Sequence, residues 1–311
     1  MPELMKLPRV APLRQRLFAG LRTGMSESAG RSAVVFAPHQ DDESLGCGGT
    51  IIRKREAGAP VGIVFMTDGA ASHRQFLGED EIRGTREEEA LRAAEKLGVD
   101  ESDVRFLGYP DGRLGDCHDL AVRRVREILE RARPEEVFIP FRNDGTADHE
   151  ATYRIVVEAL EALPGAVDVY EYPVWFWNQW PWVSLQFGFG RQSIKTFRHV
   201  VGSGCGASFF RSFRDGFFVG DVLDKKRQAL GEHRSQMSRP VSEADWPILS
   251  DVSGGEFLEC FFQEFEVFHR WKTNADMPRL SARGNRSSLA ADGSIREEVE
   301  ENARVVRRME R

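Results

Sequence analysis

The sequence predicts an α/β protein with a mostly parallel sheet between two helical layers, a three-layer sandwich. Short apolar runs alternate with longer amphipathic segments over residues 33–172, which is typical of strand–helix–strand units. Polar clusters follow four of these runs, at residues 38–43, 67–73, 109–112 and 141–149. Because parallel sheets bind ligands at the carboxyl ends of their strands, the four clusters predict one shared site.

The individual elements follow from apolar runs and from helix-ending residues. A glycine or a proline ends three of the amphipathic segments, at Gly58, Gly98 and Pro134, as expected for helix termini. The expected strands are 33–37, 61–67, 104–107, 136–140 and 167–172. The expected helices are 44–57, 85–97, 120–132 and 147–163.

The character of the chain changes after Pro173, where a Trp/Phe-rich C-terminal extension begins. Four tryptophans lie within eight residues, at positions 175, 177, 180 and 182. Phe-rich segments at 208–219 and 256–271 flank a helix expected over 222–236. We expect these segments to cover or extend the sheet. The tryptophans suit either stacking on sugar rings or packing of a lid or interface, since aromatic side chains serve both uses.

Three parts of the chain are therefore expected. An N-terminal arm covers residues 1–31, and its longest apolar stretch, Leu17 to Leu21, is too short for the core of a signal peptide. One domain covers 32–272, with 173–272 forming its lid or extension. A polar, partly helical tail covers 273–311 and includes a possible charged helix at 294–311.

Composition limits the classes of function. The chain has 311 residues, of which 41% are hydrophobic and 30% are charged, with a formal net charge of −6. A negative balance argues against nucleic acid as a partner, and no apolar run of about 18 residues predicts a membrane span. The four cysteines are widely spaced and form no CxxC pair. Reduced thiols and a cytoplasmic location are the simplest expectation.

The stretch from Val34 to Thr50, VVFAPHQDDESLGCGGT, places His39, Asp41 and Asp42 on one turn after a buried strand. Catalytic zinc sites use three protein ligands and one open position. His39 and Asp42, three residues apart, can face one point, and His149 at a later strand end is the best third ligand. Asp41 then points elsewhere and is free to act as a base on a metal-activated water.

Two other interpretations of this stretch stay open. Acidic residues also stabilise a helix N-terminus, so Asp41 to Glu43 could serve only as capping groups. The glycines of Leu45 to Thr50 resemble a nucleotide-binding turn, but such a turn needs glycine directly after the strand, and six residues intervene here.

Several motifs together resemble the LmbE/PIG-L family of zinc-dependent N-acetylglucosaminyl deacetylases. The sequence PHQDDE at 38–43 followed by LGCGG at 45–49 is similar to the family signature PHPDDE…GCGG. Further matching positions are Thr67-Asp68-Gly69, Arg86 with Glu88, Tyr109-Pro110-Asp111-Gly112, Asp148-His149 and His233-Arg234-Ser235-Gln236. The similarity covers roughly residues 32–175, and this combination of motifs is specific.

The resemblance implies hydrolysis of an N-acetyl group from a small amino-sugar substrate, on a Rossmann-like fold. It implies Zn²⁺, or another divalent transition metal, held by His39, Asp42 and His149, with Asp41 as the general base. Arg86 and Asp111 would hold substrate hydroxyls, a role that suits a forked donor and a carboxylate acceptor. No nucleic-acid partner is implied, and a homo-oligomer remains open.

The chain departs from the family at Thr146. The family's second motif usually reads HPDH or HxDH, whereas this chain has Thr146-Ala147-Asp148-His149. The first histidine is thought to stabilise the oxyanion or protonate the leaving amine, and Asp148 would lack it as a partner. Losing one oxyanion donor costs about 10²–10³ in rate.

Three consequences of this departure stay open. Asp41 serves as both base and acid; another group, such as His233, Arg142 or His73, fills the role; or activity is weak or altered. The alternatives to amino-sugar deacetylation are accordingly an amidase or deacylase acting on a thiol conjugate or natural-product scaffold, and a metal- or sugar-binding homologue without activity.

Overall fold

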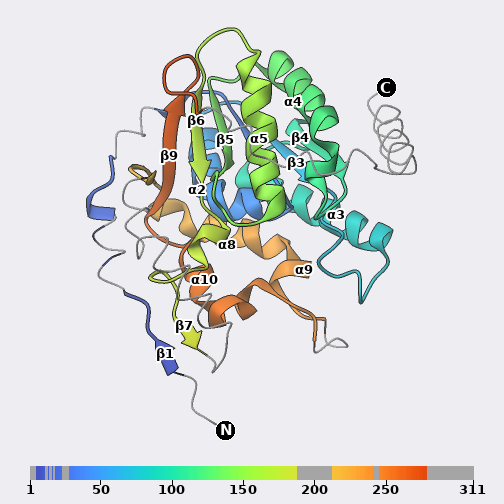
Figure 1. Cartoon of the computed structure of the whole chain (residues 1–311), viewed down its shortest axis with the longest axis vertical. Coiled ribbons are helices and arrows are strands. Elements are labelled where there is room, and N and C mark those ends of the chain that lie inside the picture. The colour runs from blue at the N-terminus through green and yellow to red at the C-terminus, as the bar shows by residue number, and fades with distance from the viewer. Residues whose placement is uncertain are drawn as a thin grey trace.

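The computed structural model describes residues 5–10, 13, 16, 18–22, 28–187, 212–240 and 245–278. A seven-stranded sheet with strand order β4-β3-β2-β5-β6-β9-β8 runs through the centre of the molecule, with helices on both faces (Figure 1). This arrangement confirms the predicted α/β class with a mostly parallel sheet. The expected helix at 294–311 lies outside the described residues, as do residues 1–4, 11, 12, 14, 15, 17 and 23–27 of the N-terminal arm.

The first five strands in the chain order of this sheet are parallel. They are β2 (Ala33–Ala37), β3 (Val61–Thr67), β4 (Val104–Tyr109), β5 (Glu136–Pro140) and β6 (Asp168–Tyr172). The chain steps outward from β2 to β3 and β4, and then returns to place β5 on the other side of β2. The strand order therefore reverses between β2 and β5, which is where open α/β sheets bind their ligands.

The C-terminal extension completes this sheet with two antiparallel strands. Strand β9 (Phe265–Lys272) pairs with β6, and β8 (Asp215–Phe218) pairs with β9 at the edge. A separate two-stranded sheet joins β1 (Met5–Leu7) to β7 (Leu185–Phe187). The described strands after Pro173 that pair with β6 and with each other therefore extend the sheet.

Two helical layers cover the sheet. Helices α2 (Asp42–Glu56), α3 (Glu79–Leu97) and α8 (Leu223–Glu232) pack against one another, and α4 (His118–Ala132) packs against α5 (Ala147–Glu161). Short helices α9 (Arg234–Met237) and α10 (Glu256–Glu259) follow α8. None of the described helices is long and apolar enough to cross a membrane.

The residues of β2 show why the core has two halves. Ala33, Val35 and Ala37 belong to the apolar cluster shared with α2, α3 and α8, whereas Val34 and Phe36 belong to the cluster shared with α4 and α5. Alternate side chains of a strand point to opposite faces of a sheet, so one fully apolar run serves both layers. The buried strand predicted at 33–37 is confirmed.

Two glycines of helix α2 lie where neighbouring side chains approach the helix backbone too closely for a Cβ atom. A Cβ at Gly46 would lie 2.3 Å from the ring of Tyr172, and one at Gly49 would lie 2.6 Å from Val219. Packing, and not a phosphate-binding turn, therefore accounts for these two glycines.

One element prediction was wrong. The continuous helix expected over 222–236 is interrupted at His233, whose ψ of 62° separates α8 from α9. The other expected helices begin and end within a few residues of their predicted bounds, except that α3 starts earlier, at Glu79.

Candidate active site

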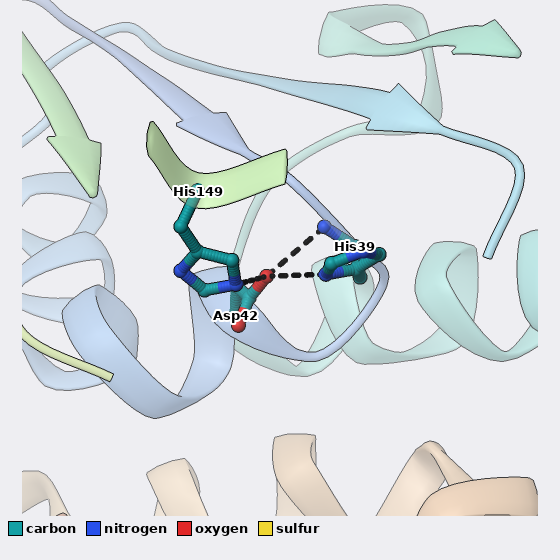
Figure 2. Close-up of side chains that lie close together, drawn as sticks. All are labelled: His39, Asp42 and His149. Atoms are coloured by element: carbon teal, nitrogen blue, oxygen red, sulfur yellow. Dashed lines mark hydrogen bonds and ion pairs between the residues drawn. The ribbon is translucent and has the colours of Figure 1, made fainter. Parts of the chain in front are cut away.

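His39, Asp42 and His149 meet at the point where the strand order reverses. His39 lies in the loop after β2, Asp42 in the first turn of α2 and His149 in the first turn of α5, which follows β5. The Oδ2 atom of Asp42 lies 3.3 Å from Nδ1 of His39 and 3.2 Å from Nε2 of His149. Figure 2 shows the three side chains pointing toward one common space. The structure thus brings together the three residues predicted as metal ligands.

Carboxylates lie behind both imidazole rings. The Nε2 atom of His39 is 3.2 Å from Asp111 and 3.3 Å from Asp148. On the other ring, Nδ1 of His149 is 2.7 Å from Asp144. Metal-ligating histidines usually present their second nitrogen to such an acceptor, which fixes the ring and raises its basicity. Each histidine therefore keeps one nitrogen directed at Asp42.

The electrostatics of the cluster favour positive charge beside Asp42. Burial alone would lower the pKa of His149, but Asp42 and Asp144 raise it to about 9. Burial likewise opposes protonation of His39, yet the carboxylates of Asp111, Asp148 and Asp42 raise its pKa well above the ordinary value. The pKa of Asp42 is held well below its usual range because His149 and His39 outweigh the effect of burial. A cation suits this space.

Asp41 lies next to the cluster in an unusual backbone conformation. Its φ is 139° and its side chain is only 9% exposed. Burial raises the pKa of Asp41 to about 7, although the nearby Arg86 guanidinium acts in the opposite direction. A carboxyl group that exchanges a proton near neutral pH is suited to general acid–base work.

Arg86 and Asp111, predicted to hold substrate hydroxyls, make extensive contacts within the protein. Arg86 is 3% exposed, donates to the carbonyl oxygens of Gly69 and Gln40 at 3.0 and 2.5 Å, and lies 3.6 Å from the Asp41 carboxylate. Asp111 accepts the N–H of Ala71 at 2.9 Å and faces His39, and its side chain is 12% exposed. Both residues therefore lie at the site and brace the loops that carry its histidine and aspartates.

Thr146 occupies the position before α5 where the family motif has histidine. Its Oγ1 atom has no hydrogen-bond partner among the described residues, and it makes no side-chain cap of α5. Asp148 is not left without partners. It accepts the N–H groups of Gly112 and Leu114 at 2.6 and 3.2 Å and also faces His39.

The three groups considered as substitutes for the missing histidine are all engaged elsewhere. His233 is 1% exposed and its Nε2 lies 2.9 Å from Glu43. Arg142 forms a two-pronged pair with Glu171. His73 stacks on Trp246 with ring centroids 4.2 Å apart, and its Nε2 lies 3.0 Å from a backbone carbonyl oxygen.

The described tryptophans of the extension pack against protein. Trp177 and Trp182 are buried edge to face, with centroids 5.3 Å apart, and Trp175 stacks on Phe257. Trp180 donates its indole N–H to the carbonyl oxygen of Pro8. These contacts favour the packing alternative over sugar stacking.

Asp144 is a site residue for which the sequence suggested no role. It is 2% exposed and accepts the N–H groups of Val174, Trp175 and Phe176, each at 2.9 Å, besides facing His149. The rule that a metal-ligating histidine needs a carboxylate acceptor, applied to the acids of loop 141–149, could have identified it.

The fold and the site define an α/β protein with a His–Asp–His cluster and a buried aspartate, Asp41, at its switch point. The family model described as PIG-L: GlcNAc-PI de-N-acetylase matches residues 34–160. A probable N-acetyl-alpha-D-glucosaminyl L-malate deacetylase 2 of Bacillus anthracis is 31% identical over 219 residues, covering 68% of this chain and 84% of that protein. The chain belongs to the PIG-L family.

Two further proteins illustrate this relationship. A diacetylchitobiose deacetylase of Thermococcus kodakarensis is 26% identical over 231 residues, covering 72% of this chain and 76% of that protein. The solved structure of N,N'-diacetylchitobiose deacetylase from Pyrococcus horikoshii is 20% identical, with a TM-score of 0.55, and the match covers 83% of this chain and 90% of that one. The latter likeness concerns the fold.

Proposed function

We propose that the protein is a zinc-dependent N-deacetylase that removes an acetyl group from a small amino-sugar-containing substrate. The single observation that carries this proposal is the convergence of His39, Asp42 and His149 beside buried Asp41 at the switch point of the sheet. The site residues follow the order along the chain that the resemblance to the family implies, which supports the roles proposed for them. The names of the relatives support an N-acetylated amino sugar as the substrate class.

The donor set fits zinc. A tetrahedral zinc ion with ligands at about 2.0–2.1 Å holds neighbouring ligand atoms about 3.3 Å apart. The two distances from Asp42 Oδ2 to the histidine nitrogens are 3.3 and 3.2 Å. Neither nitrogen of His149 makes a well-directed hydrogen bond within the described chain, although carboxylates face both. Imidazole and carboxylate ligands also suit neighbouring divalent metals, so the native ion needs measurement.

His39, Asp42 and His149 would hold the ion, and Asp41 would move the proton. Zinc supplies Lewis acidity and brings the pKa of a coordinated water to about 7. Asp41 accepts the proton of the attacking water and passes it to the leaving amine, because Thr146 offers no imidazole for that step. Arg86, 3.6 Å from the Asp41 carboxylate, favours its ionised form and so opposes the effect of burial.

Thr146 also supports a second candidate, a PIG-L homologue that binds metal or sugar without turnover. A hydroxyl group is a weaker proton donor than an imidazolium, so the amine-protonation step is the one most affected by this residue. An amidase or deacylase acting on a thiol conjugate or natural-product scaffold uses the same proposed chemistry on another substrate.

We propose that residues 32–272 act as one unit, with 173–272 as its extension. Strand β9 completes the sheet beside β6, and the Glu266 carboxylate accepts N–H groups of Gly49 and Thr50 in α2 at 2.7 and 2.8 Å. Truncation after residue 250 removes β9 and is expected to abolish folding.

The test is amine release from a panel of N-acetylglucosamine glycosides, thiol-conjugate amides and N-acylated natural-product scaffolds, with zinc-loaded protein. The proposal expects release from the sugars, and Asp41→Ala should keep one equivalent of metal but lose turnover. Full activity in Asp41→Ala would refute the assigned base. Stoichiometric metal with no release from any substrate would favour the non-catalytic homologue.

A further inference from the structure

The backbone of Asp41 is strained, and one neighbouring side chain holds it. A φ of 139° lies in a region that residues with a Cβ rarely adopt. Such conformations persist only where the surrounding structure over-determines them. The Asp41 N–H donates to Oε2 of Glu43 at 3.0 Å, so the side chain two residues later closes this turn.

Glu43 is itself fixed by His233, which lies 190 residues further along the chain. The other carboxylate oxygen of Glu43, Oε1, is 2.9 Å from Nε2 of His233 and accepts the Ser44 hydroxyl at 2.6 Å. Both partners are almost fully buried, with side chains 1% exposed. Water therefore cannot take the place of His233 as the partner of Glu43 in the native fold.

His233 occupies the break between α8 and α9, and this segment is anchored on both sides. Ser235 donates its N–H and its hydroxyl to Glu89 of α3 at 2.9 and 2.7 Å. Before the break, Lys226 of α8 donates to the Leu45 carbonyl oxygen of α2 at 2.8 Å. These contacts set the imidazole of His233 against α2, and the break that made the predicted continuous helix wrong is what turns the ring inward.

We propose that His233 and Glu43 form a positioning pair that holds the strained turn of Asp41 and so fixes the direction of its carboxylate. His233 acts through Glu43 and is a positioning residue, because its Nε2 is occupied by Glu43 and its side chain is buried. The proposal rests on the proposed function, in which Asp41 moves the proton. It assigns to the C-terminal extension a part, through Glu43, in placing that carboxylate.

The experiment compares two substitutions at the same position. His233→Gln keeps an N–H donor close to the position of Nε2, whereas His233→Leu keeps bulk and removes the donor. His118→Leu is the matched control, because His118 and Glu158 form a pair of the same 2.9 Å length whose side chains are only partly buried. Zinc content, kcat and KM for amine release, and a thermal melt are measured for each variant.

A misplacement of about 1 Å in a reacting group costs about 10²-fold in rate. His233→Leu is expected to lower kcat by about 10- to 100-fold on that basis, with KM and zinc stoichiometry unchanged, because the group affected acts in the chemical step. His233→Gln should recover most of the lost kcat, and His118→Leu should behave as the wild type. An unchanged kcat in folded His233→Leu, equal losses in both His233 variants, or loss of zinc in place of kcat would overturn the proposal.

A crystal structure of the His233→Leu variant separates this inference from the proposed function. If the wild type releases no amine, the proposed function fails, but the backbone of Asp41 still reports on the pair. The inference expects the bond from the Asp41 N–H to Glu43 to be lost and φ to leave its strained value. An unchanged turn in that variant would refute the positioning role, whatever the activity. Should His233→Leu not fold, the structure and kcat of His233→Gln decide, because both must match the wild type.

Discussion

Asp144→Asn tests the proposed metal site and the loop beside it in a single substitution. The Asp144 carboxylate faces Nδ1 of His149 at 2.7 Å and accepts the Trp175 N–H at 2.9 Å through the same oxygen, Oδ2. Its other oxygen accepts the N–H groups of Val174 and Phe176. Asparagine retains the shape of the side chain, and its oxygen can keep the bonds to Val174 and Phe176. Its NH₂ group, in the place of Oδ2, can neither accept the Trp175 N–H nor act as an acceptor beside Nδ1 of His149.

The expected losses follow from these contacts. A hydrogen bond to a charged group contributes about 1.5–3 kcal/mol, so losing the Trp175 bond should lower the free energy of unfolding by that amount. Removing the acceptor behind a metal-ligating histidine lowers metal affinity by about 10- to 100-fold, which equals about 1.4–2.7 kcal/mol of binding free energy. The metal effect should therefore be of the same size as the stability effect, and separately measurable.

Zinc affinity by competition with a chromophoric chelator and urea unfolding of the metal-free protein measure the two quantities. Asp116→Asn is the control, because Asp116 is 56% exposed and pairs with Arg113 on the surface. Zinc affinity within about threefold of wild type, together with an unfolding free energy within about 0.5 kcal/mol, would refute the reasoning that Asp144 supports both His149 and the loop.

Three further predictions concern the metal site and the packing around α2. Because the pKa of His149 without metal is about 9, the proposed zinc ion would have to displace its proton. Zinc affinity from pH 6 to 8 should therefore rise by about tenfold per pH unit for each proton displaced. Titrations in zinc-buffered solution check this, and a flat profile would contradict it. Lys226→Met removes a buried ammonium group that pairs with a buried carboxylate at 2.7 Å. It should lower the free energy of unfolding, measured by urea denaturation, by about 3–5 kcal/mol; an unchanged midpoint would show that the pair is not needed. Gly46→Ala places a Cβ 2.3 Å from the ring of Tyr172 and should lower the free energy of unfolding by about 1–3 kcal/mol. Gly30→Ala is the control: its Cβ has no atom within 4 Å, so the free energy of unfolding should not change.

The sheet could be predicted from the sequence because each parallel strand is a nearly continuous apolar run. The run at 33–37 has all five residues buried, and alternate members serve opposite faces. The metal-binding cluster could be proposed for a similar reason. His39 and Asp42 lie within one turn, and His149 follows a second strand that ends at the same edge of the sheet.

The supporting contacts could not be predicted, because they join distant segments without any periodic pattern. Glu43 meets His233 across 190 residues, and Glu266 meets α2 across more than 200. Each of these contacts depends on how α8 and β9 dock, which local propensity does not determine. The break at His233 likewise lies inside a segment with helical composition, where tertiary contacts override the local preference.

The most direct test of the account measures amine release from an N-acetylglucosamine glycoside by metal-stripped protein as zinc is added back. The account predicts no release from the stripped protein, full recovery at one equivalent of zinc, and neither zinc binding nor recovery in His149→Leu. Undiminished release by the stripped protein, or one equivalent of tightly bound zinc in His149→Leu, would contradict the central claim that His39, Asp42 and His149 form the catalytic metal site.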